Sequence, residues 1–205
     1  MRSAPANQPM QSAAQTLAAT VPVERVRRPS GRSERSLIRG AQAGSQSDME
    51  LLFRRHWPRA YRAAFLIVHD HAAAEDIAQE AFLAAIRRLD RFDRRRPFGP
   101  WLGAIVANRA IDWVRARTAR REIDNLSPEP VASGDPPLGA YSGELLAALA
   151  SLSAEHRAVV VMRYVLEYTP GEIARALELP RGTVNSRLRR GLDVLETRLR
   201  EAELR

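Results

Sequence analysis

Apolar side chains recur at steps of three and four residues along much of the chain. The most regular stripe runs from Ala74 to Leu89, and this spacing is the period of an amphipathic helix. A broader apolar face precedes it in residues 48–68, where Pro58 marks either a kink or a helix start. Helical spacing returns from Trp101 onward. The first half of the chain therefore predicts a small bundle of helices.

Three interruptions divide this helical pattern. Residues 69–76 make a short break, and residues 90–100, which contain two prolines and a glycine, make a loop. Residues 122–143 differ in composition, because they hold four prolines, four acidic residues and no arginine. This composition is typical of a linker between two domains.

The segment after this linker predicts three or four further helices. Ser153 followed by acidic Glu155 marks one helix start, so the β-branched run at residues 159–165 belongs to a helix rather than a strand. No alternation with a period of two stands out along the chain. The fold class that we expect is all-α.

The expected organisation is two small helical domains, at residues 36–121 and 144–205, joined by a flexible linker at residues 122–143. Residues 1–35 are rich in Ala, Ser, Gln, Pro and Arg without a helical period, and we expect a disordered tail there. Its basic end is either a solvated segment or a DNA-binding arm.

One stretch near the C-terminus predicts two helices joined by a tight turn. In "YTPGEIARALELPRGTVNSRLRRGL", Thr169 can cap the first helix, with Pro170 at its first position and Glu172 three residues after the cap. Val184 and Leu188 anchor the second helix against the first. This is the arrangement of a helix-turn-helix.

Short polar side chains and arginines occupy the other face of that second helix. Such a face fits the major groove of DNA, where its side chains contact base edges and phosphates. A merely solvated helix would favour better helix formers than serine and asparagine. The residues that we expect to contact DNA are Arg181, Thr183, Asn185, Ser186, Arg187, Arg189 and Arg190.

The charge balance agrees with a polyanionic partner. The net charge is +8, and all 32 basic residues are arginine, whose guanidinium group binds phosphates and guanine edges in a bidentate manner. Eleven arginines and only three acidic residues lie between residues 87 and 121. Backbone phosphates explain this imbalance better than solvation does.

Several classes of chemistry lack the residues that they need. The chain has no cysteine, which excludes disulfides, thiolate zinc sites and cysteine nucleophiles. His69 and His71 have no further ligand at a metal-binding spacing. The acidic residues Glu75, Asp76 and Glu80 have no partner base or nucleophile.

No apolar run approaches the roughly 18 residues that span a bilayer, and the N-terminus lacks the apolar core of a signal peptide. We therefore expect a cytoplasmic protein that is not an enzyme and needs no cofactor.

Three stretches follow one another in the chain: "AEDIAQEAFLAAIRRLDRF", "PFGPWLGAIVANRAIDWVRAR" and "LSAEHRAVVVMRYVLEYTPGEIARALELPRGTVNSRLRRGLDVL". Their order and spacing resemble the bacterial RNA polymerase sigma factors of the extracytoplasmic-function (ECF) group, over about residues 36–200. The resemblance implies that the first domain is sigma region 2 and the second is sigma region 4. It also implies that the chain binds core RNA polymerase and directs promoter recognition and transcription initiation.

The resemblance further implies which residues act. Those implied to dock on the clamp helices of the polymerase β′ subunit are Asp76, Gln79, Glu80 and Leu83. Those implied to contact the −10 element, with the loop holding a flipped base, are Arg94, Arg95, Asn108, Arg109, Asp112 and Arg115. Region 4 would bind the β flap and, through its last helix, the −35 element. An anti-sigma factor would hold such a protein inactive.

The chain departs from the family pattern at two positions of the helix-turn-helix. Glycine is frequent in the turn where this chain has Glu178, so a left-handed backbone there would be strained. A basic residue is usual in place of Asn185, so we expect an atypical −35 preference. The alternative function is an autonomous dimeric helix-turn-helix regulator that binds a palindrome. That function leaves the acidic face of the first domain without a purpose.

Overall fold

The structure, a computed structural model, describes residues 32–124 and 143–203, and these two ranges contain helices and no strand. The elements are α2 (Glu34–Gln42), α3 (Gln46–Val68), α4 (His71–Arg87), the 3-10 turn η1 (Leu89–Arg91), α5 (Phe98–Asp124), α6 (Gly143–Ala150), α7 (Ala154–Tyr164), α8 (Pro170–Ala176) and α9 (Arg181–Glu203). Residues 1–31 of the predicted tail and residues 125–142 of the predicted linker lie outside the described residues. The tail was predicted to run to residue 35, whereas α2 already begins at Glu34, because Ser33 caps it. The expected all-α fold class is confirmed.

The first interruption is shorter than the sequence predicts. Helix α3 continues through Pro58, and α4 already begins at His71, so only residues 69 and 70 separate the two helices. The carboxylate of Asp70 accepts a hydrogen bond of 3.0 Å from the backbone N–H of Ala73 and caps α4. The capping aspartate therefore starts the helix inside the stretch that we expected to be a break.

Helix α5 extends beyond both of its predicted ends. It begins at Phe98, within the predicted loop, because Pro100 is tolerated in a first turn, where its missing N–H has no helical partner. It ends at Asp124, within the segment predicted as linker. The structure thus gives one helix of 27 residues along the first half of the molecule.

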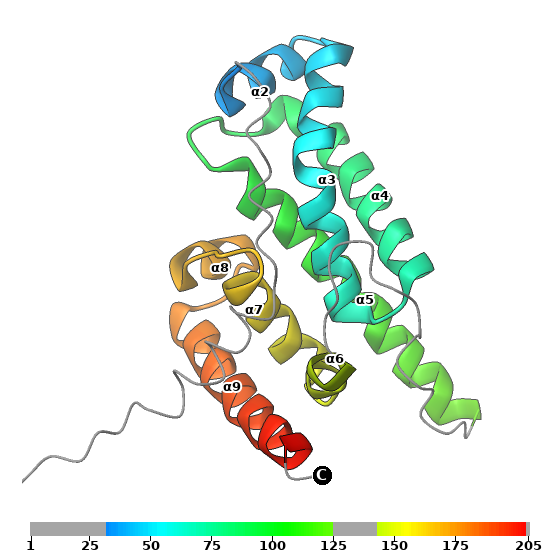
Figure 1. The fold of residues 1–205 in the computed structure, drawn as a ribbon. Coiled ribbons are helices and arrows are strands. Elements are labelled where there is room, and N and C mark those ends of the chain that lie inside the picture. The colour runs from blue at the N-terminus through cyan, green and yellow to red at the C-terminus, as the bar shows by residue number, and fades with distance from the viewer. Residues whose placement is uncertain (1–31, 125–142, 204–205) are drawn as a thin grey trace, which may run out of the picture.

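Helices α3, α4 and α5 form an antiparallel bundle, and α2 closes one end of it (Figure 1). Ala74, Ala78 and Ala81 of α4 are completely buried, and their small side chains let neighbouring helices approach closely. Phe65 and Ile67 of α3 fill the space between the helices. This bundle contains the residues that we expected to contact polymerase and the −10 element.

Helices α6 to α9 form a second bundle, in which α9 lies beside α6, α7 and α8 (Figure 1). Ser153 caps α7 as predicted, because its side chain accepts the backbone N–H of His156. A Cβ on Gly191 would lie 2.9 Å from Cγ2 of Val160, so glycine lets α9 approach α7 closely.

The two bundles also contact each other. Helix α7 lies against α3 and α5, and α8 lies against α5 (Figure 1). The buried side chains of both bundles belong to one continuous apolar core. The sequence predicts the two bundles but not this contact between them.

A buried arginine joins the two bundles at the end of α3. The guanidinium group of Arg157 in α7 donates hydrogen bonds to the carbonyl oxygens of Ile67, Ala150 and Leu152, the last two at 2.9 Å. His69, which ends α3 in a left-handed conformation (φ 55°), is buried nearby. Burial, together with the positive charge of Arg157, lowers the pKa of His69 to about 3.

Because His69 is buried in its neutral form, we expect the folded protein to lose stability in acid. In the unfolded chain His69 takes up a proton below pH 6.5, whereas in the folded protein it stays neutral down to about pH 3. The free energy of unfolding therefore decreases as the pH falls from 6.5 towards 3. The penalty amounts to about 2 kcal/mol between pH 7 and pH 5. Replacing His69→Asn, a residue that tolerates a left-handed backbone, should remove this part of the loss. Urea unfolding of both proteins at the two pH values measures it, and an identical pH dependence would refute the assignment.

Candidate nucleic-acid interface

The helix-turn-helix begins with the predicted cap. The side chain of Glu172 accepts the backbone N–H of Thr169 at 2.8 Å, and the hydroxyl of Thr169 accepts the N–H of Glu172 at 3.2 Å. These reciprocal bonds form a capping box, with Pro170 at the first helical position. The predicted start of α8 is therefore confirmed.

The turn between α8 and α9 contains the strained residue that we expected. Glu178 has φ 53°, in the left-handed region that glycine occupies without steric cost. The next residue, Leu179, donates its N–H to the carbonyl of Ala174 at 2.9 Å and closes the turn. The turn therefore keeps its geometry although glutamate replaces the more suitable glycine.

Helix α9 presents its predicted polar residues outward. Val184 and Leu188 are buried against the bundle, whereas the seven predicted contacts, Arg181, Thr183, Asn185, Ser186, Arg187, Arg189 and Arg190, are exposed or half-buried. We call these seven residues the recognition face. The hydroxyl of Ser186 donates to the carbonyl of Thr183 at 2.9 Å and keeps its lone pairs for a donor from outside.

The arginines of the recognition face have no acidic partner among the described residues. No ion pair joins Arg181, Arg187, Arg189 or Arg190 to a carboxylate within the described parts of the chain. Four guanidinium groups on one exposed helix favour an anion, and phosphates and guanine edges match their geometry.

The residues expected on α4 are all exposed at the surface. Asp76, Gln79, Glu80 and Leu83 form what we call the docking face, and Leu83 is 52% exposed. The amide of Gln79 donates to Glu75 at 3.3 Å. Glu80 forms an ion pair with Arg109 of α5, so the docking face touches one of the residues expected to contact the −10 element.

Helix α5 places the other expected −10 residues along one exposed line. Asn108, Asp112 and Arg115 are exposed at steps of four and three residues. Arg115 donates from Nε to Oε1 of Glu155 in α7 at 2.9 Å, and it also lies 4.0 Å from Asp112. The sequence identifies Glu155 as an acidic residue at a helix start but does not predict its contact with Arg115, because forty residues separate the two.

The loop before α5 carries the two remaining residues, Arg94 and Arg95, both exposed. Gln42 of α2 fixes the start of this loop, because its amide donates to the carbonyls of Leu89 at 2.8 Å and Phe92 at 3.0 Å. The rings of Phe92, Phe98 and Trp101 pack together, with centroids 4.6 to 5.6 Å apart, below the loop. No motif or periodic pattern in the sequence marks Gln42.

Two histidines, His71 and His156, were checked for a metal site and for the role of a catalytic base. His71 bonds through Nδ1 to the hydroxyl of Tyr61 at 2.8 Å, and within residues 32–124 and 143–203 no cluster of three metal-ligating side chains occurs. Ser153 lies 2.7 Å from Nδ1 of His156, but the same hydroxyl caps α7, and Nε2 of His156 is buried without a hydrogen bond. Burial and the charges of Arg187 and Arg190 lower the pKa of His156. In a catalytic triad a third group, often a carboxylate, orients the imidazole that activates the nucleophile. No carboxylate among the described residues bonds to the imidazole of His156, so Ser153 and His156 do not form such a site.

Family models match both bundles. The model of sigma-70 region 2 matches residues 52–120, and that of sigma-70 region 4 matches residues 142–195. The chain belongs to the sigma-70 family of RNA polymerase sigma factors. As a sigma factor it binds core RNA polymerase and directs promoter recognition, so an autonomous dimeric regulator is not favoured.

Curated relatives place this sigma factor in the ECF group. It is 30% identical to the ECF sigma factor SigW of Bacillus subtilis, over 80% of this chain and 95% of SigW. It is 34% identical to the ECF sigma factor SigL of Mycobacterium tuberculosis, over 80% of this chain and 96% of SigL. It is 36% identical to the sigma factor CarQ of Myxococcus xanthus, over 78% of this chain and 94% of CarQ.

Solved structures share the fold of this sigma factor. CnrH, in complex with the cytosolic domain of CnrY, superposes with a TM-score of 0.63 at 27% identity, over 82% of this chain and 97% of CnrH. The sigma factor RpoE from Bartonella quintana, in complex with the anti-sigma factor NepR, has a TM-score of 0.65 at 22% identity, over 75% of this chain and 97% of RpoE. Within the described ranges, none of the helices of this sigma factor has the length and hydropathy required to cross a membrane.

Proposed function

We propose that the docking face of α4 binds the clamp helices of the polymerase β′ subunit, while region 4 binds the β flap. The docking face combines two carboxylates, one amide and the exposed side chain of Leu83. An apolar anchor surrounded by polar groups is a common composition of a protein interface. Because the docking face is acidic although the chain has a net charge of +8, its binding partner is a protein rather than DNA, whose phosphates would repel it.

The recognition face of α9 reads the −35 element in this proposal. The observation that carries it is the set of four arginines that have no acidic partner in residues 32–124 and 143–203. They lie on a helix whose opposite side is anchored by Val184 and Leu188. Thr183, Asn185 and Ser186 add short donors and acceptors for base edges. Helix α5 and the loop before it contact the −10 element through Arg94, Arg95, Asn108, Arg109, Asp112 and Arg115.

Gln42 positions the −10 loop in this proposal. Replacing Gln42→Ala removes both bonds to the carbonyls of Leu89 and Phe92, so the loop loses its fixed starting point. We expect promoter opening, followed with a fluorescent base in the −10 element, to weaken about fivefold to tenfold, since one or two neutral hydrogen bonds are lost.

Core binding should stay unchanged in that variant, because Gln42 is not part of the docking face. The matched control is Gln46→Ala, an exposed glutamine at the start of α3. If Gln42→Ala opens the promoter as well as wild type does, Gln42 does not position the −10 loop.

The chain itself performs no catalysis in this proposal and lends its specificity to polymerase in the cytoplasm. Two weak DNA contacts fixed on one large partner act at a high effective concentration, so neither needs to be tight alone. An anti-sigma factor would control it, by analogy with the anti-sigma complex of RpoE and with CnrH bound to CnrY.

Run-off transcription with core RNA polymerase tests this function. Core enzyme with the purified chain should give promoter-specific transcripts from genomic fragments, and core enzyme alone should give none. Transcripts that do not depend on the added chain would overturn the proposal.

A further inference from the structure

Helix α2 carries two arginines, Arg35 and Arg39, that none of the roles above uses. Together with Gln42 they follow one another at steps of four and three residues, so the three side chains lie on one side of the helix. Gln42 donates to the carbonyls of Leu89 and Phe92 at the start of the −10 loop. Because the two arginines share a side with Gln42, they lie on the flank of that loop. We call Arg35 and Arg39 the α2 stripe.

The charges of the α2 stripe have no partner within the described parts of the chain. Both arginines are exposed, and neither forms an ion pair with a described carboxylate. The carboxylates of Glu34, within α2, and Asp48, beside it, bind His56 and Arg32 instead. Two unpaired guanidinium groups one turn apart on an exposed helix favour an anion.

Three contacts hold α2 in a fixed position on α3. Arg32, just before the helix, forms an ion pair with Asp48, which is 2% exposed. Gly40 lets α2 approach this carboxylate, because a Cβ at that position would collide with Oδ2 of Asp48. The carboxylate of Glu34 bonds to Nε2 of His56 at 2.9 Å. The α2 stripe is therefore presented from a rigid support, so little ordering is needed when it binds a partner.

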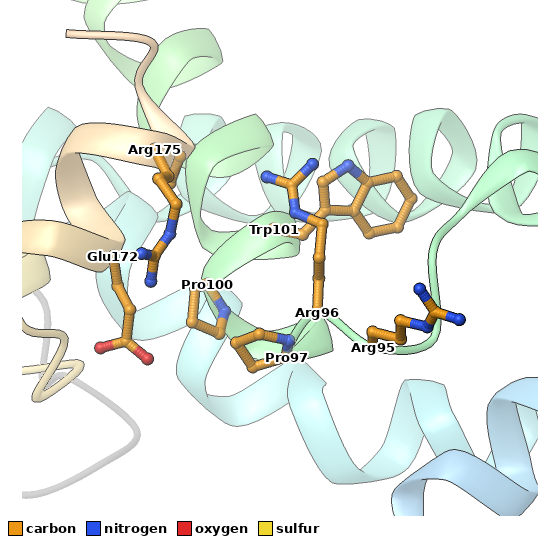
Figure 2. Close-up of a pocket in the computed structure, with 8 residues that line it drawn as sticks. Arg95, Arg96, Pro97, Pro100, Trp101, Glu172 and Arg175 are labelled. Atoms are coloured by element: carbon orange, nitrogen blue, oxygen red, sulfur yellow. The ribbon is translucent and has the colours of Figure 1, made fainter.

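The −10 loop continues the positive surface that the α2 stripe begins. Figure 2 shows Arg95 and Arg96 extending from this loop in different directions, and Arg94 beside them is exposed. The carboxylate of Asp93 accepts the backbone N–H of Arg95 at 2.9 Å, so this acid is engaged by the turn of the loop. A DNA strand held by the loop would therefore pass the α2 stripe with its neighbouring phosphates.

The α2 stripe is separate from the surface that we assign to polymerase. The docking face lies on α4, whereas α2 closes one end of the bundle (Figure 1). The stripe has no apolar side chain of its own, and protein interfaces usually centre on one. Exposed guanidinium groups without an apolar anchor suit the phosphates of DNA better. The model of sigma-70 region 2 matches only from residue 52 onward, so α2 precedes the matched segment.

We propose that Arg35 and Arg39 bind backbone phosphates of promoter DNA next to the −10 element. The contact adds affinity and fixes the position of the strand, because phosphates carry no sequence information. It rests on the proposed function, in which the −10 loop holds the −10 element.

The salt dependence of promoter binding by the holoenzyme, the chain bound to core polymerase, tests this contact. Arg35→Gln with Arg39→Gln removes both charges and keeps good helix formers. This variant should bind the promoter about tenfold more weakly than wild type. The slope of log affinity against log salt concentration should become shallower by about 1.4 to 1.8, since each phosphate contact contributes about 0.7 to 0.9. Arg35→Lys with Arg39→Lys keeps both charges and should keep the wild-type slope.

A matched control removes the same net charge from another part of the surface. Arg198 and Arg200 are exposed near the end of α9, where Arg198 pairs with Glu201 at 3.1 Å. Arg198→Gln with Arg200→Gln should keep the promoter affinity within twofold of wild type and leave the slope unchanged. Equal losses in both glutamine variants would show a general effect of net charge and overturn the assignment to α2.

Uncharged methylphosphonate linkages in the promoter locate the contact. Placed next to the −10 element, they should weaken binding of wild type about fivefold and leave the α2 glutamine variant unchanged, because that variant has no charge left to lose a partner. Placed next to the −35 element, they should weaken both proteins equally. Equal losses of both proteins at the −10 linkages would overturn the proposal.

Binding to core polymerase without DNA separates the remaining outcomes. The α2 glutamine variant should bind core as wild type does, and a loss of core affinity equal to its promoter defect would assign the stripe to polymerase instead. If the wild-type holoenzyme binds no promoter specifically, the proposed function fails and the α2 contact fails with it. If wild type binds and the glutamine variant matches it, only the α2 contact fails.

Discussion

Replacing Asp76 and Gln79 together with alanine is expected to weaken the binding of core RNA polymerase by roughly 30-fold to 150-fold. Each polar side chain at the centre of an interface contributes about 1–1.5 kcal/mol when truncated, and 1.4 kcal/mol is a factor of ten in affinity. Both residues are exposed on α4 and point away from the core, so the fold should tolerate the change. Fluorescence anisotropy of the labelled chain, titrated with core enzyme, measures the effect.

A matched control removes two polar residues from another exposed helix face. Glu50 and Arg54 of α3 form an ion pair of 2.6 Å between well-exposed side chains, so Glu50→Ala with Arg54→Ala should leave the affinity for core within twofold of wild type. Equal losses in both double variants would show that the docking face has no special role. An unchanged affinity of the Asp76 and Gln79 variant would show that the docking assignment is wrong.

Replacing Arg187→Ala should cost about 1–3 kcal/mol at one base pair of the −35 element. Arg187 has no acidic partner in the described parts of the chain, and it lies on the recognition face one turn after Thr183. If its guanidinium group reads a guanine edge, the variant should become insensitive to base changes at that single position. Run-off transcription from a set of promoters, each with one −35 base pair changed, gives this pattern.

The same promoter set separates base reading from phosphate binding. A uniform loss over all promoters, with a weaker dependence on salt, would identify Arg187 as a phosphate contact instead. The control is Arg198→Ala on the last turns of the same helix, where the guanidinium group pairs with Glu201 at 3.1 Å. That variant should transcribe every promoter as wild type does.

Local signals explain what the sequence predicted. The apolar stripe of α9, the cap at Ser153 and the capping box of Thr169 and Glu172 depend on residues within one or two turns, and all are present in the structure. The resemblance to a family in which glycine is frequent at this turn position raised the left-handed backbone at Glu178, and Glu178 has φ 53°. The break predicted at residues 69–76 was too long, because Asp70 caps a helix that begins at His71.

Long-range contacts explain what the sequence did not predict. Gln42 reaches carbonyls 47 and 50 residues away, and Arg157 reaches one 90 residues away. Such bonds leave no periodic pattern in the sequence, because they form only when the complete helical bundles pack together. In the sequence Gly99 belongs to a predicted loop, and the close packing of Gly99 and Gly103 of α5 against the ring of Tyr168 is visible only in the structure.

The most direct test of the whole account compares two affinities of the purified chain, one for core RNA polymerase and one for duplex DNA alone. The account predicts a tight complex with core, weak and salt-sensitive binding to free duplex, and specific promoter binding only when core is present. Sequence-specific binding to free duplex, together with no association with core, would contradict it.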